Sequence, residues 1–137
     1  MNKRDLKLDK YGISKKRYKE LCGFCEQYPE WIKQINAGVF ISAVNLDGMP
    51  HNPNKGKSDL TGNAAIAMIN KKKNCELIER VAKMASEEFW EYIIKSVCFE
   101  VPVTYLIMVD NMPLSQSAFY EKRRYFFFLL DREKNCA

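Results

Sequence analysis

The carboxy-terminal third of the chain constrains the fold most strongly, because its pattern predicts two helices separated by one tight break. An apolar segment covers residues 104–110, and a break at residues 111–113 follows it directly. A second segment opens at Ser115 and passes through polar and basic residues into a group of aromatic residues. Two helices joined by a turn of three or four residues are typical of a helix-turn-helix. We therefore expect this motif at about residues 104–134.

The second helix of this segment carries the side chains that point to a chemistry. Positions 116, 117, 120, 121 and 124 share one helical face. Gln and Arg suit bidentate contacts with adenine and guanine, and Ser and Tyr suit base edges or phosphates. Glu121 opposes this interpretation, because a carboxylate repels phosphate unless it binds a cytosine amine. We predict base contacts from Gln116, Ser117, Tyr120 and Arg124, and phosphate contacts from Ser115, Lys122, Arg123, Lys3, Arg4, Lys7 and Lys10.

The opposite side of the same helix is predicted to be buried. Its apolar residues are Ala118, Phe119, Tyr125, Phe126 and Leu129. The aromatic run at residues 125–128 exceeds what one helix face can bury, so part of it must pack elsewhere. Tyr28 and Trp31 are candidates for that contact, and an uncovered remainder would mark a protein interface. Such an interface would serve a homodimer, RNA polymerase or another protein.

Basic residues are concentrated at the amino terminus. Residues 1–20 hold eight Lys and Arg against three Asp and Glu, and 8 − 3 = +5 equals the net charge of the whole chain. An arm of this charge suits phosphate contact, because neutralised phosphates release counterions. The alternative is a solvated chain end.

Hydropathy along the chain predicts a small helical bundle. Hydrophobic residues make up 47% of the sequence, which is enough for a core, and no apolar run approaches the roughly 20 residues that span a bilayer. The charged first 20 residues lack the apolar centre of a signal peptide. With one short strand candidate at residues 39–44 and no partner for it, the fold class is all-α. We expect a cytoplasmic protein with no membrane contact.

Capping and turn residues predict the helix boundaries. Ser14 caps a helix to about residue 27, and Pro29 opens a short helix that Gly38 ends. Residues 45–62, rich in Asn, Gly, Pro and Lys, are predicted to be a flexible linker between an amino-terminal segment, 1–44, and a helical body, 63–137. In that body we expect a helix over 63–85 with Ile66, Ile69, Leu77, Ile78, Val81 and Met84 as its apolar stripe. A helix over 87–99 capped by Ser86, and a further helix capped by Thr104, follow it.

Other constellations point to chemistry less directly. Cys22 and Cys25 form a C-x-x-C, but a redox site needs a βαβ context and structural zinc needs two further ligands, for which His51 and Cys75 are candidates. The five cysteines are expected to remain reduced thiols. No phosphate-binding glycine motif or paired carboxylates are present, so we expect no enzyme and no cofactor.

The carboxy-terminal half resembles the phage late-gene transcription activators of the RinA/ArpU type, which are similar to region four of bacterial sigma factors. The matching residues are 113–120, the basic residues 122–124 and the apolar residues 126–130. The resemblance covers about residues 63–134 and implies a long helix and a shorter one before a helix-turn-helix. Residues 108–111 depart from it, because they lack the small residue and glycine that are common near the turn.

The sequence therefore predicts a phage-type transcription regulator that binds double-stranded DNA. Two alternatives remain at this point. One is a small helical factor that inhibits or redirects another protein, such as a host nuclease or RNA polymerase. The other is a DNA-packaging factor of the small terminase type.

Overall fold

All regular secondary structure in the described parts of the chain is α-helical. The structure is a computed structural model that describes residues 11–46 and 58–136. The helices are α1 (Lys15–Glu26), α2 (Tyr28–Leu46), α3 (Ser58–Ala85), α4 (Trp90–Val97), α5 (Val103–Met108) and α6 (Gln116–Cys136). The all-α prediction is confirmed. No helix within these ranges is both long and apolar enough to cross a bilayer.

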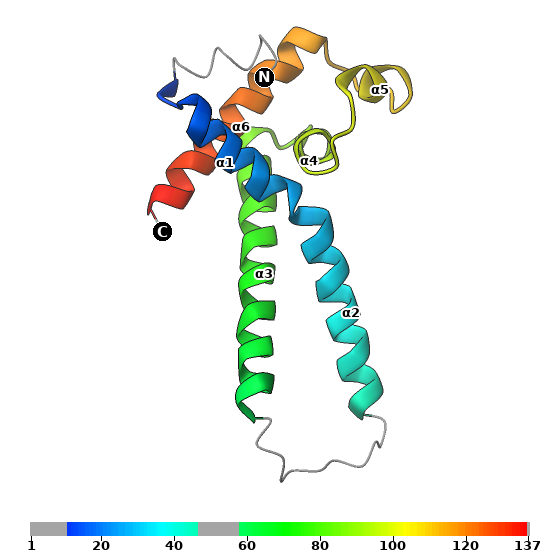
Figure 1. The fold of residues 1–137 in the computed structure, drawn as a ribbon. Helices are drawn as coiled ribbons and strands as arrows, with labels where there is room; N and C mark the ends of the chain where they lie inside the picture. Colours follow the sequence, from blue (N-terminus) through cyan, green and yellow to red (C-terminus); the bar gives the residue numbers. More distant parts are fainter. Residues whose placement is uncertain (1–10, 47–57, 137) are drawn as a thin grey trace.

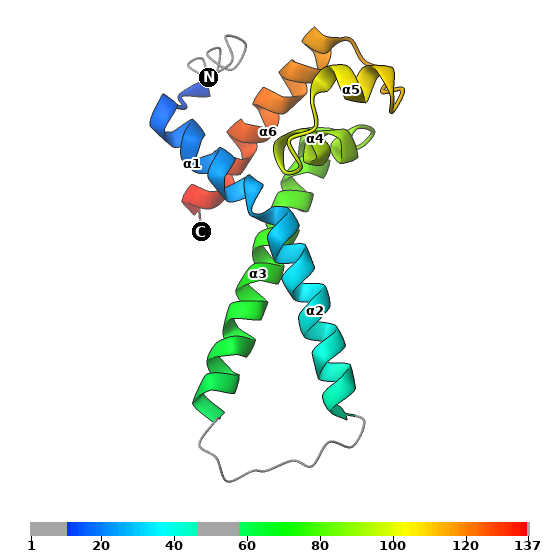
Figure 2. The same cartoon turned by 45° about the vertical axis from the view of Figure 1, so that its right-hand side comes forward.

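A projecting hairpin and a helical head make up the molecule (Figure 1). α2 and α3 run side by side in opposite directions and extend away from the other helices (Figure 2). The 28 residues of α3 give it a length of about 42 Å. Its carboxy-terminal half enters the head, where α3 contacts α4 and α6. α3 is thus the element that joins the hairpin to the head.

α6 lies at the centre of the head. Phe119, Phe126 and Phe127 of this helix have no exposed surface. Each of the surrounding helices contributes a fully buried side chain to the same core: Leu21 from α1, Ile78 from α3, Ile93 from α4 and Leu106 from α5. The bundle is therefore built around one helix that its neighbours enclose on most sides.

The aromatic run of α6 packs against the amino-terminal part of the chain, as expected, but through other residues than those predicted. The rings of Tyr18 and Phe127 lie 5.1 Å apart, and those of Tyr11 and Phe128 lie 5.3 Å apart. Trp31 packs on Phe24, while Tyr28 packs on Phe99. The α1 end of the chain, rather than the start of α2, covers the aromatic run.

Serine caps fix the starts of two helices. Ser14 Oγ accepts a hydrogen bond from the backbone N–H of Arg17 (3.2 Å). Ser115 Oγ accepts one from the N–H of Ala118 at the same distance. Both predicted caps are confirmed, because each satisfies an amide that has no partner within its helix. The predicted Thr104 cap is wrong: α5 begins at Val103, directly after Pro102.

Gly38 does not end α2, which corrects the prediction at this point. The helix continues to Leu46, so residues 39–44 are helical rather than extended. A Cβ atom on Gly38 would lie 2.5 Å from Cε of Met68. The glycine therefore permits a close approach of α2 and α3, and packing offsets its cost of about 1 kcal/mol in a helix. The predicted linker is also shorter, because α2 and α3 occupy its two ends; residues 47–57 lie outside the described structure.

The predicted apolar stripe of α3 is only partly buried. Ile78 and Val81 have no exposed surface, but Ile66 and Ile69 are 59% and 50% exposed. The difference follows from the position along the helix: the second half of α3 lies in the head, whereas the first half lies in the hairpin. Periodicity alone cannot distinguish a stripe that other helices cover from one that they leave open.

Phe127→Ala is expected to destabilise the protein by about 3–5 kcal/mol, because it opens a cavity among helices that meet at α6. Tyr125→Ala is the matched control on the same helix, since Tyr125 is 41% exposed. Urea denaturation followed by circular dichroism measures both free energies of unfolding. Equal losses for the two variants would contradict the assigned orientation of α6.

Candidate functional site

The connection between α5 and α6 has a defined backbone geometry. Asn111 has a positive φ of 56°, and the N–H of Met112 donates to the carbonyl oxygen of Leu106 (2.9 Å). Met112 and Leu106 are both buried, as is Phe119 in the first turns of α6. A left-handed residue is the usual means by which a helix ends and the chain reverses. Asparagine adopts this conformation more readily than most residues, so Asn111 takes the place of a glycine.

The outer side of the amino-terminal half of α6 is polar. Ser117 and Glu121 are exposed, and Gln116 and Lys122 are partly exposed. Ser115 lies exposed directly before the helix, where its hydroxyl caps the amide of Ala118. Free amides at such a helix start favour an anionic partner. We define this set, Ser115, Gln116, Ser117, Glu121 and Lys122, as the outer face of α6; it surrounds the exposed start of the helix, because positions 116, 117 and 122 point in directions at least 100° apart.

Two of the four predicted base-contacting residues point into the protein, which corrects the prediction for them. Tyr120 and Arg124 are only 8% and 3% exposed. The Arg124 guanidinium forms an ion pair with Glu121 at 2.6 Å. The edges of DNA bases cannot reach these two buried side chains unless α6 separates from the helices that pack against it. The prediction failed because long amphipathic side chains such as arginine can line a core while their head groups remain paired.

The predicted phosphate contacts are distributed differently as well. Lys122 Nζ lies 5.7 Å from the ring centroid of Phe89 and remains partly exposed, so its ammonium group can still reach a ligand. Arg123 faces inward, where Nη1 donates to Ser96 Oγ (3.0 Å) and Nη2 to Tyr18 OH (3.4 Å). These bonds direct the Arg123 guanidinium towards α4 and α1, away from the outer face of α6. Lys3, Arg4, Lys7 and Lys10 lie outside the described residues.

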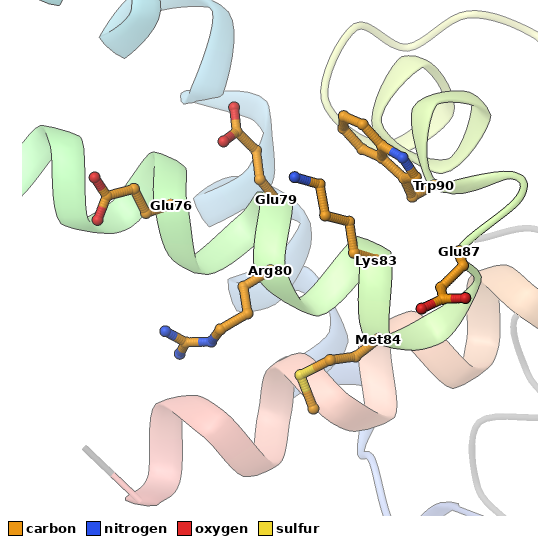
Figure 3. Close-up of a pocket in the computed structure, with 7 residues that line it drawn as sticks. All are labelled: Glu76, Glu79, Arg80, Lys83, Met84, Glu87 and Trp90. Carbon is orange, nitrogen blue, oxygen red and sulfur yellow. The ribbon is translucent and has the colours of Figure 1, made fainter.

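A shallow groove of about 730 Å³ runs along α3 towards the start of α4 (Figure 3). Most of its charged groups are already paired. Lys83 Nζ lies 4.7 Å from the centroid of the Trp90 ring, and Arg80 pairs with Glu133 at 3.4 Å. Glu79 accepts a hydrogen bond from Tyr28 OH at 2.6 Å. Because these partners come from the chain itself, the groove offers little unsatisfied charge to a ligand.

Cys22 and Cys25 lie in an environment that favours the protonated thiol. Cys25 is buried beside Cys98, and the hydrogen bond between the two thiols, together with burial, raises the pKa of Cys25 well above its usual value. Burial also raises the pKa of Cys22, which Tyr18 and Arg123 partly offset. Among the described side chains, no group of three or more His, Cys, Asp or Glu could hold a metal ion. His51, the histidine considered as a zinc ligand, lies outside them.

Comparisons of the chain with models of known protein families, with curated proteins and with solved structures give no match. The function of the site is therefore inferred from the geometry of its residues. Of the predicted residues, Ser115, Gln116, Ser117 and Lys122 keep exposed surface around the start of α6, whereas Tyr120 and Arg124 are buried and Arg123 bonds to Ser96 and Tyr18. Sequence reasoning missed the left-handed Asn111, although an asparagine directly after an apolar helix is a recognisable signal for that conformation.

Asn111→Gly is expected to leave stability unchanged or to raise it slightly, because glycine accepts a positive φ without strain. Asn111→Val should destabilise the protein by roughly 1–2 kcal/mol, since a β-branched side chain opposes this conformation. Thermal unfolding of both variants measures the difference. A valine variant as stable as the glycine variant would show that the chain does not need a left-handed residue here.

Stability is expected to fall as the pH rises from about 9 towards 11. Burial raises the pKa of Cys75 from 9.0 to about 11 in the folded chain. The folded state therefore keeps its proton through this interval while the unfolded state loses its own, so unfolding becomes more favourable. Urea denaturation at a series of pH values measures the slope, with Cys75→Ala as the variant in which this contribution disappears. If the free energy of unfolding of that variant falls with pH as steeply as that of the wild type, Cys75 is not the cause.

Proposed function

We propose that this protein is a DNA-binding regulator that uses α5, the turn at Asn111 and α6 as a helix-turn-helix. The proposal rests on the left-handed Asn111, which lies in the connection between these two helices. Leu106, Met112 and Phe119, which come from α5, the connection and α6, are all buried in the core. The connection that contains Asn111, residues 109–115, is longer than the three or four residues typical of the motif, and it leaves Ser115 and Ser117 exposed at the start of α6. The left-handed Asn111 supports the motif at the position where a glycine was missing from the sequence.

The outer face of α6 supplies the proposed DNA contacts. Gln116 and Ser117 lie at the start of the helix, where the recognition helices of such motifs contact bases. Ser115 and Lys122 flank them and are assigned to phosphates. Tyr120, Arg123 and Arg124 are instead assigned to holding α6 in place.

Glu121 is less unfavourable to this proposal than its charge alone indicates. Its carboxylate is paired with the buried guanidinium of Arg124 at 2.6 Å. The pair neutralises much of the negative charge that would otherwise repel a phosphate next to Ser117. In return, Glu121 gives the buried arginine a counter-charge, which an interior cation requires.

The resemblance to phage late-gene activators of the RinA/ArpU type adds the biological class to this proposal. It implies a phage or prophage regulator that acts on double-stranded DNA, alone or together with RNA polymerase. The net charge of +5 is in keeping with an acidic partner.

A second function, binding of another protein, is favoured by a specific observation. Tyr105, Met108 and Val109 are 49%, 79% and 55% exposed at the end of α5. Large apolar side chains clustered at a surface are a common feature of protein interfaces. This cluster is adjacent to the proposed DNA-binding helix, so the same region also suits the alternative of a small helical factor that inhibits or redirects another protein.

Selection of a preferred sequence from random duplex DNA, followed by fluorescence anisotropy at several salt concentrations, tests the DNA proposal. Gln116→Ala should weaken binding to the selected site by roughly 1–3 kcal/mol and leave binding to random DNA nearly unchanged. Lys122→Ala should weaken binding to both the selected site and random DNA. It should also lower the slope of log affinity against log salt concentration by about 1, because one phosphate contact is lost. Lys72→Ala, an exposed lysine on the hairpin, is the matched control and should change neither.

Two outcomes would contradict the DNA proposal. One is the absence of salt-dependent binding to any duplex, and the other is equal loss on selected and random DNA for Gln116→Ala. If a stable complex with another protein forms in either case and Met108→Asp disrupts it, the protein-binding function is supported instead.

A further inference from the structure

A groove of about 310 Å³ lies between α1, α6 and the segment that links α4 to α5. Its lining is mixed: Val101 and Pro102 are apolar residues that keep exposed surface, whereas Val97 and Phe127 lie buried behind it. The Arg123 guanidinium also lines this groove, next to the hydroxyl groups of Tyr18 and Ser96. The groove thus places one cation beside accessible apolar side chains, a combination that small-molecule sites use.

Arg123 has no acidic partner within ion-pair distance among the described residues. Its two hydrogen bonds go to neutral hydroxyl oxygens, and its Nε is buried without an acceptor. Arg17, by comparison, pairs with both Asp131 and Glu20. A partly buried guanidinium with only neutral partners keeps most of its desolvation cost, and an incoming anion would remove that cost.

We propose that this groove binds a small organic monocarboxylate, with its carboxylate on Arg123 and its apolar part against Val101 and Pro102. The planar fork of a guanidinium matches a carboxylate with two parallel hydrogen bonds. This binding site does not depend on the proposed DNA contacts, which lie on the outer face of α6.

The charges around the groove select a monoanion over a dianion. Glu26 and Glu100 also line it, and both side chains are exposed. Their negative charge opposes any anion, and it opposes a doubly charged phosphate about twice as strongly as a carboxylate. Glu26 and Glu100 therefore disfavour a ligand with two negative charges, while the positive charge of Arg123 favours a negative ligand over a neutral one.

Titration with benzoate, followed by amide shifts in ¹H–¹⁵N spectra of the full chain, tests the site. Benzoate should shift the amides of Ser96, Val101 and Arg123 in a saturable manner. Benzamide has nearly the same shape without the charge and should bind roughly ten-fold more weakly or worse. Inorganic phosphate should bind more weakly than benzoate. Equal binding of benzoate and benzamide would overturn the proposal.

Variants assign the binding to Arg123. Arg123→Met should abolish the benzoate shifts, while Arg132→Met, which removes an exposed arginine stacked on Phe128, should leave them unchanged. If the Arg123→Met chain does not fold, the double variant Glu26→Gln/Glu100→Gln provides the test, because removal of the opposing charges should tighten benzoate binding severalfold. Unchanged or weaker binding in the double variant would overturn the proposal, as would wild-type binding in a folded Arg123→Met chain.

Discussion

The burial of α6 is the constraint on which the rest of the structure depends. Phe119, Phe126 and Phe127 have no exposed surface, and α1, α3, α4 and α5 all contact this one helix. Side chains on most of its circumference are therefore committed to the core. The exposed surface that remains lies around the start of the helix and along the stripe of Ser117, Glu121, Tyr125 and Arg132, and the assignment of function depends on which residues fall there.

This constraint explains the placement of the basic residues 122–124. Three consecutive positions spread over about 200° of a helix, so they cannot all face solvent when most of the helix is enclosed. Lys122 remains at the margin, Arg123 points towards α1 and α4, and Arg124 is buried with Glu121 as its ion-pair partner. A basic run of this kind in a central helix thus contributes one outward cation instead of three.

Local signals in the sequence predicted local structure well. The Ser14 and Ser115 caps and the helical class depend on neighbouring residues, and the structure confirms them. Two predictions failed for reasons that are not local. The helix continues through Gly38, where Met68, 30 residues away in the chain, packs against it. The face of α6 was assigned by the polarity of its residues, whereas burial by four other helices decided it. The outer face and the Arg123 groove could be found only once those contacts were known.

The two proposed sites lie on one rigid helix and face different directions. Ser117 is on the outer face, whereas Arg123 lines the groove between α1 and α6. A ligand in the groove can alter DNA binding only if α6 adopts two positions in the protein and the ligand binds more tightly to the protein with α6 in one of them. Such a difference has a structural basis here, because Arg123 bridges α6 to Ser96 of α4 and Tyr18 of α1 through bonds that a carboxylate would share or replace. Arg123 would then link occupancy of the groove to the position of α6, and the outer face would move with the helix as one body.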